Sequence, residues 1–268
     1  MIDTHCHIDA AEFDGDRDGV LSAAFSAGLT GIVVPAVERA NFGAVSSVCR
    51  DEPRCHAAYG IHPMYVDRAH GDDLAVLHET LRRERAVAVG EIGLDRFVEP
   101  RNEQRQEWYF VAQLIIAREM GLPVLLHVRR AIDPVLKHLR QTRVPGGIAH
   151  AFNGSRQQAD EFIKLGFKLG FGGSMTFERS SRIRQMAATL PLDAIVVETD
   201  APDISPAWAA DDRNSPAQLP RIIDTLAALR RISREEAAQA TTENACAALP
   251  GLRMPHLNIS GTETKPLH

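Results

Sequence analysis

The sequence predicts an α/β protein built as a single (β/α)8 TIM barrel, and three observations support this fold class. The chain has 268 residues, and a barrel of this kind needs roughly 250 residues. Short segments rich in β-branched residues alternate with longer amphipathic segments along the whole chain, which is typical of parallel strands joined by helices. Finally, the residues that follow five of the predicted strands are polar, and active sites of barrels lie at the C-terminal ends of their strands.

Eight strands are predicted, each of them a short apolar run ahead of a longer segment with helical periodicity. Eight such units in a chain of this length indicate a closed parallel barrel with right-handed connections. The predicted strands span Met1–Thr4, Thr30–Ala36, Cys55–Gly60, Ala86–Gly90, Pro123–Leu126, Gly147–Ala149, Phe167–Phe171 and Ala194–Val197.

The clearest predicted helix spans Arg101–Met120, where the apolar residues fall largely on one stripe, and Gly121 with Pro123 ends it. Later helix starts are predicted by capping-box patterns, one of which has proline at the favoured first position. These patterns lie at Ser155–Gln158, Ser215–Gln218 and Ser233–Glu236.

An open, doubly wound sheet is the structural alternative to the barrel. Such a sheet usually carries a glycine-rich phosphate loop after its first strand, whereas this chain has His5-Cys6-His7 there. We therefore expect one barrel domain over residues 1–252, since no linker or repeat divides it. Residues 253–268 are polar and aperiodic, which predicts a flexible C-terminal tail.

The composition excludes several classes of protein. The formal net charge is −5, so nucleic acid is not expected to bind through bulk positive charge, although an enzyme with metal ions and a few arginines is compatible. All apolar runs are much shorter than the roughly 20 residues that a membrane-spanning helix needs. The first residues, Met1–His5, show neither the basic nor the apolar segment of a signal peptide, so export is not expected. The four cysteines lack disulfide or metal-binding spacing. We therefore expect a cytoplasmic protein with reduced thiols.

Residue types that bind metals gather at the ends of the predicted strands. His5 and His7 are two residues apart, so strand geometry directs both rings to one face. In a closed barrel the strand ends converge on one mouth, where unpaired charges would be costly, so the set predicts a divalent-metal centre. The candidate ligands are His5, His7, Glu91, His127, His150 and Asp200.

Two ions are expected rather than one, because six ligands exceed the set that a single tetrahedral ion uses. Glu91, in the middle strand of the set, is the candidate bridge between them. Four histidine ligands favour zinc, manganese, iron or nickel over magnesium. In the expected division, one ion takes His5, His7 and Asp200, and the other takes His127 and His150.

Further side chains are candidates for catalysis and substrate binding. Asp200 either takes a proton from the attacking water or serves only as a ligand. His62, held by the following Pro63, is a candidate to contact the scissile phosphate or to protonate the leaving group, and a structural histidine is its alternative. Arg129 follows His127 by two residues and so predicts a phosphate clamp on the same face.

Two carboxylates are predicted to lie behind the ligands. Glu198 precedes Asp200 by two residues and is expected to orient His5 or His7. Asp95 is the second candidate for such a supporting role. A structural ion pair between Arg129 and either carboxylate is the alternative role of that arginine.

Six motifs closely resemble those of the TatD family of metal-dependent hydrolases, within the amidohydrolase-like barrel superfamily. The resemblance covers residue 3 to about residue 250, and Val33–Ala36 with Arg213–Pro216 look closest to the bacterial YjjV-like branch. It implies a (β/α)8 barrel, a divalent-metal site on the six ligands above, and phosphodiesterase action on DNA supported by Mg2+. The motifs are Asp3–His7, Gly60–Pro63, Gly90–Asp95, Leu126–Arg129, His150–Phe152 and Glu198–Pro202.

The expected function is therefore hydrolysis of DNA phosphodiester bonds by metal-activated water, with 3′–5′ trimming as one mode. The same centre acting on an ester or amide, such as an aminoacyl ester of tRNA, is the alternative, and a non-enzymatic metal- or nucleic-acid-binding barrel is the alternative of another class. Arginines at the mouth, around Arg129, Arg130 and Arg179, would favour phosphodiesters. We expect a monomer that needs Mg2+, Mn2+ or Zn2+ and neither an organic cofactor nor a membrane.

Overall fold

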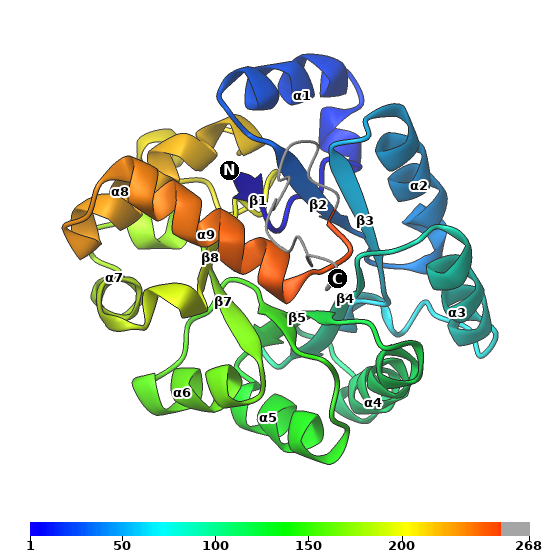
Figure 1. The fold of residues 1–268 in the computed structure, drawn as a ribbon. Helices are drawn as coiled ribbons and strands as arrows, with labels where there is room; N and C mark the ends of the chain where they lie inside the picture. The colour runs from blue at the N-terminus through cyan, green and yellow to red at the C-terminus, as the bar shows by residue number, and fades with distance from the viewer. Residues whose placement is uncertain (253–268) are drawn as a thin grey trace, which may run out of the picture.

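Eight parallel strands form a barrel at the centre of the molecule, and helices surround it (Figure 1). The structure, a computed structural model, describes residues 1–252, so the tail predicted at 253–268 lies outside the described residues. The strands pair in chain order from β1 to β8. The Thr4 backbone N–H donates to the Val197 carbonyl (3.1 Å) and so connects the first and last strands. The predicted (β/α)8 barrel is confirmed.

All eight strands lie where the sequence predicts them, with small shifts at their ends. Two of them continue further than predicted, because β4 and β5 remain paired as far as Asp95 and Arg129. Glu91 and His127 consequently lie inside strands rather than after them. The strands are β1 (Ile2–Asp3), β2 (Gly31–Pro35), β3 (Cys55–Tyr59), β4 (Ala88–Asp95), β5 (Val124–Arg129), β6 (Gly147–Ala149), β7 (Phe167–Phe171) and β8 (Ile195–Val197).

The helices begin and end close to the signals in the sequence. The predicted capping box at Ser155 is present, and Ser233 accepts from the Glu236 N–H (3.0 Å). The predicted capping box at Ser215 is wrong in part. The Gln218 side chain accepts from Trp208 Nε1 rather than from the Ser215 backbone, and a short 3-10 turn precedes the helix. The helices are α1 (Arg17–Ser26), α2 (Phe42–Asp51), α3 (Asp73–Arg83), α4 (Glu103–Met120), α5 (Ile132–Gln141), α6 (Arg156–Lys164), α7 (Ser181–Thr189), α8 (Leu219–Arg230) and α9 (Arg234–Ala248).

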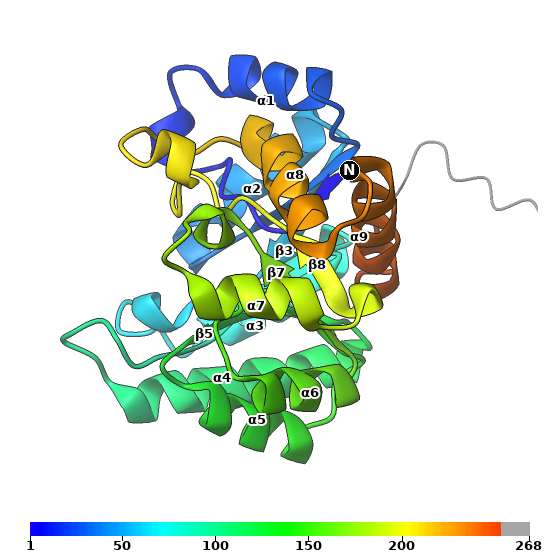
Figure 2. The same ribbon diagram turned by 90° about the vertical axis from the view of Figure 1, so that its left-hand side faces the viewer.

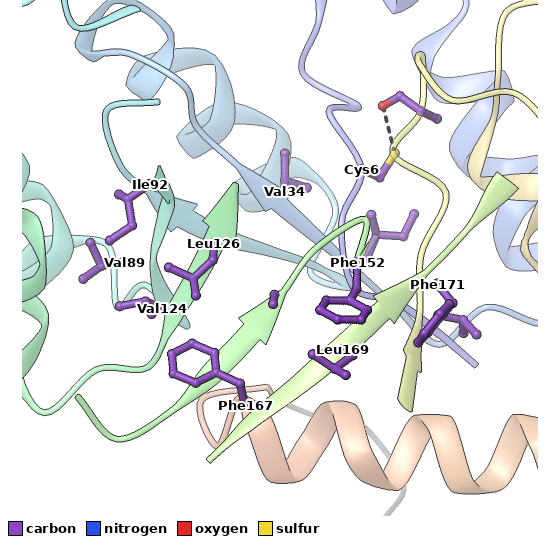
Figure 3. Close-up of a cluster of buried hydrophobic side chains, with 14 of the residues drawn as sticks. Cys6, Val34, Val89, Ile92, Val124, Leu126, Phe152, Phe167, Leu169 and Phe171 are labelled. Atoms are coloured by element: carbon purple, nitrogen blue, oxygen red, sulfur yellow. Dashed lines mark hydrogen bonds between the residues drawn. The ribbon is translucent and has the colours of Figure 1, made fainter. Parts of the chain in front are cut away.

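Strand side chains alternate between two hydrophobic clusters. Val124 and Leu126 of β5 belong to the cluster that packs beneath the helices (Figure 3). Leu125, between them, belongs to a second cluster inside the barrel. Since side chains two residues apart share a face of a strand, His127 lies on the inner face with Leu125. In the same way, the inner residue Ile148 of β6 predicts an inward direction for His150.

Helix α9 closes one end of the barrel. Its residues Ala245, Ala248 and Leu249 pack against the inner cluster of strand residues. In Figure 1 this helix crosses in front of the strands, and Figure 2 shows it on one side of the molecule, with the loops that follow the strands on the other. The carboxyl ends of the strands are therefore left as the open end. Within residues 1–252, no helix combines the length and apolar character needed to cross a membrane.

Candidate metal centre

The open end of the barrel holds a cavity of about 1610 Å³. Five of the six predicted ligands line this cavity, and the sixth, His5, is fully buried just beneath it. His62, Arg129 and Glu198 also line the cavity. The structure therefore brings the predicted ligands together at one place, although they come from strands far apart in the sequence.

Glu91 occupies the middle of this cluster because β4 is irregular at that point. The pairing of β4 with β5 shifts register between Val89 and Ile92, and Glu91 lies within the shift. Gly93 follows with a φ of +154°, and a Cβ there would overlap the His127 carbonyl. The Gly-Glu-Ile-Gly pattern thus allows β4 to approach β5 closely enough for both strands to present ligands to one site.

The two carboxylate oxygens of Glu91 face different sets of histidine nitrogens. Oε2 lies 3.1 Å from His5 Nε2 and 3.6 Å from His7 Nε2. On the other side, three ring nitrogens approach Oε1, namely His127 Nδ1 (3.0 Å), His62 Nε2 (3.6 Å) and His150 Nε2 (3.7 Å).

The outer nitrogens of three of these rings have acceptors that fix their tautomers. An outer nitrogen that donates to an oxygen carries the proton, so the inner nitrogen of the neutral ring carries a lone pair. The donor and acceptor pairs are His7 Nδ1 with the Pro35 carbonyl (3.2 Å), His127 Nε2 with Asp95 Oδ2 (2.9 Å) and His150 Nδ1 with Glu198 Oε1 (3.1 Å).

The inner nitrogens lie against carboxylate oxygens and against one another. The Nε2 atoms of His5 and His7 are only 3.3 Å apart. Lone pairs and carboxylate oxygens repel at such distances unless positive charge lies among them. Neutral imidazole and carboxylate are also the donor set that zinc-like divalent ions prefer. The residues present therefore fit a divalent-metal centre.

The protonation equilibria of the cluster show the same demand for positive charge. Burial opposes ionisation of Glu91, but His5, His62 and the other histidines outweigh it and hold its pKa well below the ordinary range. Burial alone would lower the pKa of His150, but Asp200 and Glu198 raise it to about 10. A buried carboxylate thus stays ionised beside a histidine that holds its proton tightly.

Asp200 reaches the cluster from the segment after β8. Its backbone has a φ of +57°, in the left-handed region that aspartate adopts more readily than most residues other than glycine. Its N–H donates to the His5 carbonyl (2.8 Å), and its Oδ1 lies 3.7 Å from Nε2 of both His5 and His7. Asp3, which the sequence alone did not single out, anchors this segment by accepting from the Thr199 N–H and hydroxyl.

Three groups of ligand atoms in residues 1–252 are close enough to hold an ion, with every atom of a group within 4.8 Å of the others. Two of the groups contain Glu91, and His127 and His150 fall in different groups rather than together as the sequence predicted. The groups are His5 with His7 and Asp200, His5 with Glu91 and His150, and His62 with Glu91 and His127.

Asp95 and Glu198 each bond to a histidine of the cluster, but the predicted partner of Glu198 is wrong. Glu198 bonds to His150 and to the Ala151 N–H (2.6 Å), and not to His5 or His7. It fits there because β7 carries Gly170, where a Cβ would overlap the Glu198 carboxylate. Two strands that are not neighbours, β6 and β8, thus meet through this pair.

His62 presents a proton rather than a lone pair to the centre. Its Nδ1 accepts from the Met64 N–H (3.2 Å), so Nε2, which faces Glu91, carries the proton. Burial and the neighbouring His127 lower the pKa of His62 to about 4. The ring is therefore a neutral hydrogen-bond donor across the physiological range.

Arg129 lies at the rim of the cavity, with its guanidinium carbon 3.7 Å from the centre of the Phe97 ring. In residues 1–252 it forms no ion pair with Asp95 or Glu198, which was the structural alternative for this arginine. Arg179 does not line the cavity, because its guanidinium lies over Phe177. Sequence reasoning missed Phe97, whose signal was an aromatic residue in a polar loop after a strand.

Comparisons with known proteins identify relatives of this chain. A protein-family model described as "TatD related DNase" matches residues 2–250. The chain is 41% identical over 247 residues to "Uncharacterized metal-dependent hydrolase YjjV" of Escherichia coli (strain K12), covering 91% of this chain and 95% of that protein. It is also 31% identical over 238 residues to "3'-5' ssDNA/RNA exonuclease TatD" of Erwinia billingiae (strain Eb661), with coverages of 86% and 91%.

A solved structure gives the same result for the fold. The crystal structure of YjjV, a TatD homologue from Escherichia coli K12, matches with a TM-score of 0.90 and 40% sequence identity. The match covers 93% of this chain and 98% of that one. The chain therefore belongs to the TatD family of metal-dependent hydrolases.

Proposed function

We propose that this hydrolase is a deoxyribonuclease that cleaves phosphodiester bonds, with removal of nucleotides from a 3′ end as its mode. The observation that carries the proposal is the cluster of histidine nitrogens around the two oxygens of Glu91, in a cavity whose rim carries arginines that form no ion pair within residues 1–252. Such a centre suits a substrate with anionic oxygens. The relative from Erwinia billingiae, named an exonuclease, supports the same substrate class.

Two divalent ions are proposed for the centre, with Glu91 between them. The support is that each Glu91 oxygen faces its own set of nitrogens, Oε2 toward His5 and His7, and Oε1 toward His127 and His150. Asp200 would complete the first set. When bound there, the ions would polarise a phosphoryl oxygen and lower the pKa of a coordinated water.

The protein's own groups would then position the substrate and move protons. The Asp200 carboxylate, partly accessible from the cavity, would accept a proton from the attacking water. His62 would donate its Nε2–H to an anionic oxygen of the scissile phosphate, since a neutral ring with a pKa of about 4 is a poor source of a full proton. Arg129 would hold phosphate from the rim.

The experiment is cleavage of single-stranded DNA, labelled at either end, by metal-stripped protein supplied separately with Mg2+, Mn2+ or Zn2+. We expect metal-dependent release of nucleotides from the 3′ end. The His127→Ala variant is expected to lose more than about a hundredfold in rate, since it removes a ligand rather than a supporting group. His78→Ala, which changes an exposed histidine of α3, is the matched control and should act as wild type.

Absence of cleavage with every ion, while the protein still binds metal, would contradict the nuclease proposal. Carboxylic esters and amides, including aminoacyl esters of tRNA, would then be the substrates to test. Cleavage that persists in His127→Ala would contradict the placement of the reaction at this centre.

A further inference from the structure

Two of the four arginines that line the cavity have unengaged guanidinium groups. Arg96 pairs with Glu103 (3.3 Å), and Arg182 donates to Asn153 Oδ1 (2.6 Å). In the part of the chain that the structure describes, the guanidinium groups of Arg129 and Arg130 form neither ion pairs nor hydrogen bonds. Their N–H groups are thus free to bind an external anion.

Phe97 gathers these two guanidinium groups at one point of the rim. Their central carbons lie 3.7 Å and 4.5 Å from the centre of its ring, and Phe97 as a whole residue is 43% exposed. Stacking uses the flat face of a guanidinium, so its N–H edge remains available for a phosphate. We call Phe97, Arg129 and Arg130 the Phe97 clamp.

The backbone also supports this arrangement. Arg130 has a φ of +55°, a left-handed conformation that residues other than glycine adopt uncommonly, and it turns the chain directly after β5. The Arg96 N–H donates to the Arg129 carbonyl (2.9 Å) and so joins the loop that carries Phe97 to the end of β5. The three side chains are therefore held together before any ligand arrives.

The opposite side of the cavity is acidic. The residues after β1, β2 and β8 contribute carboxylates to the lining, whereas the Phe97 clamp follows β4 and β5. A polyanion is repelled from the first side and attracted to the second. The acidic residues of the lining on that side are Asp9, Glu12, Glu38 and Asp203. On the clamp side the lining contains Asp133, whose carboxylate accepts from Gln158 Nε2 (2.9 Å).

We propose that the Phe97 clamp is a subsite for a phosphate that is not cleaved, one nucleotide away from the metal centre, on single-stranded nucleic acid. Arg129 lies two residues beyond His127 on β5, which is roughly 6.6 Å along a strand. One nucleotide covers such a span. The exposed ring of Phe97 offers an apolar surface to an unpaired base or sugar. The identity of the cleaved bond rests on the proposed function, but binding at the clamp does not.

Binding is tested with metal-loaded, full-length protein and a fluorescent oligothymidylate of ten nucleotides, whose phosphorothioate linkages resist hydrolysis. The variants are Phe97→Ala, Arg129→Gln and Arg130→Gly, the last of which suits the left-handed backbone. The matched control is Arg221→Gln, whose guanidinium stacks on Trp208 (4.2 Å) outside this cavity.

The double variant Arg129→Gln/Arg130→Gly is expected to raise Kd at least tenfold, Phe97→Ala at least threefold, and Arg221→Gln less than twofold. The logarithm of the association constant decreases linearly with the logarithm of the salt concentration. The magnitude of this slope should be smaller by about 0.7 for each phosphate that the variant no longer binds. Wild-type binding by the double variant, or equal affinity of wild type for a duplex of the same length, would overturn the proposal. Thermal melting of each variant separates these effects from loss of fold.

Hydrolysis then distinguishes this proposal from the proposed function. For the double variant, the loss of kcat/KM on a DNA decamer should be at least fivefold greater than on bis(p-nitrophenyl) phosphate, which has one phosphate. Equal losses on both substrates would place the arginines at the cleaved bond and overturn the subsite. If the wild type cleaves neither substrate but the binding pattern holds, the nuclease proposal fails and the subsite stands.

Discussion

The metal centre depends on single atoms that lie behind its histidines. The acceptors at the outer nitrogens of His7, His127 and His150 decide which nitrogen of each ring carries a lone pair. The residue types of the ligands were predictable from the ends of the strands. The acceptors behind the ligands were harder to predict from the sequence, because the contact of Glu198 with His150 depends on how β6 and β8 are staggered around the barrel.

Asp95→Asn tests this dependence. The amide can donate to Nε2 of His127, which moves the ring proton to Nδ1 and removes the lone pair that faces Glu91. We expect metal affinity to fall by about 10- to 100-fold, measured by isothermal titration calorimetry. Asp224→Asn, an exposed carboxylate paired with Arg234, is the control and should bind metal as wild type does. Unchanged affinity in Asp95→Asn would show that this hydrogen bond does not set the tautomer.

Metal binding should release protons, and its affinity should rise with pH. Although burial opposes it, the carboxylates of Asp200 and Glu198 raise the pKa of His150 to about 10, so the metal-free ring is protonated at neutral pH. A metal must displace that proton, so apparent affinity increases up to about tenfold per pH unit until the pH passes about 10. Calorimetry in two buffers of different ionisation enthalpy counts the protons. A binding enthalpy that is the same in both buffers would contradict this expectation.

At the scale of elements, close approach of strands determines where the carboxylates lie. The sequence predicted β4 and β5 but ended both too early, because Glu91 and His127 resemble polar breaks rather than inward-facing strand residues. Their pairing continues to Asp95 and Arg129, past a register shift that the pattern of apolar residues does not reveal. The glycines of β4 were the available signal, since a strand glycine often marks a close backbone approach.

Gly170→Ala tests such an approach on β7. A Cβ there would overlap the Glu198 carboxylate, which in turn holds His150. We expect the free energy of unfolding to fall by about 1–3 kcal/mol, and metal affinity to fall with it. Gly43→Ala in α2 has open space around the new methyl group and should stabilise by about 0.5–1 kcal/mol. Urea unfolding of both variants measures the difference, and a neutral Gly170→Ala would contradict the packing argument.

At the scale of the whole molecule, the barrel separates stability from function. Helix α9 and the inner cluster close one end, and the ligands occupy the other. The alternation of apolar strands and amphipathic segments predicted this arrangement, because eight such units in 268 residues fit a closed barrel. The division of the cavity into an acidic and a basic side was not predictable, because it depends on which loops meet across the mouth.

Removal of metal should destabilise the whole barrel, because the centre joins strands from both halves of the chain. A ligand at 100 times its Kd stabilises the folded state by about 2.7 kcal/mol, which corresponds to roughly 5–10 °C in Tm for a chain of this size. We expect calorimetry to show a drop of that order with a chelator and full recovery with Zn2+. A Tm that is insensitive to both additions would contradict metal binding to the folded state.

The most direct measurement is anomalous diffraction from crystals of the zinc-loaded protein. We expect two peaks with the Glu91 carboxylate between them. One should lie beside His5, His7 and Asp200, and the other beside Nδ1 of His127 and Nε2 of His150, which both face Glu91 Oε1. A single peak, or coordination of His127 through Nε2 with its bond to Asp95 broken, would contradict the account.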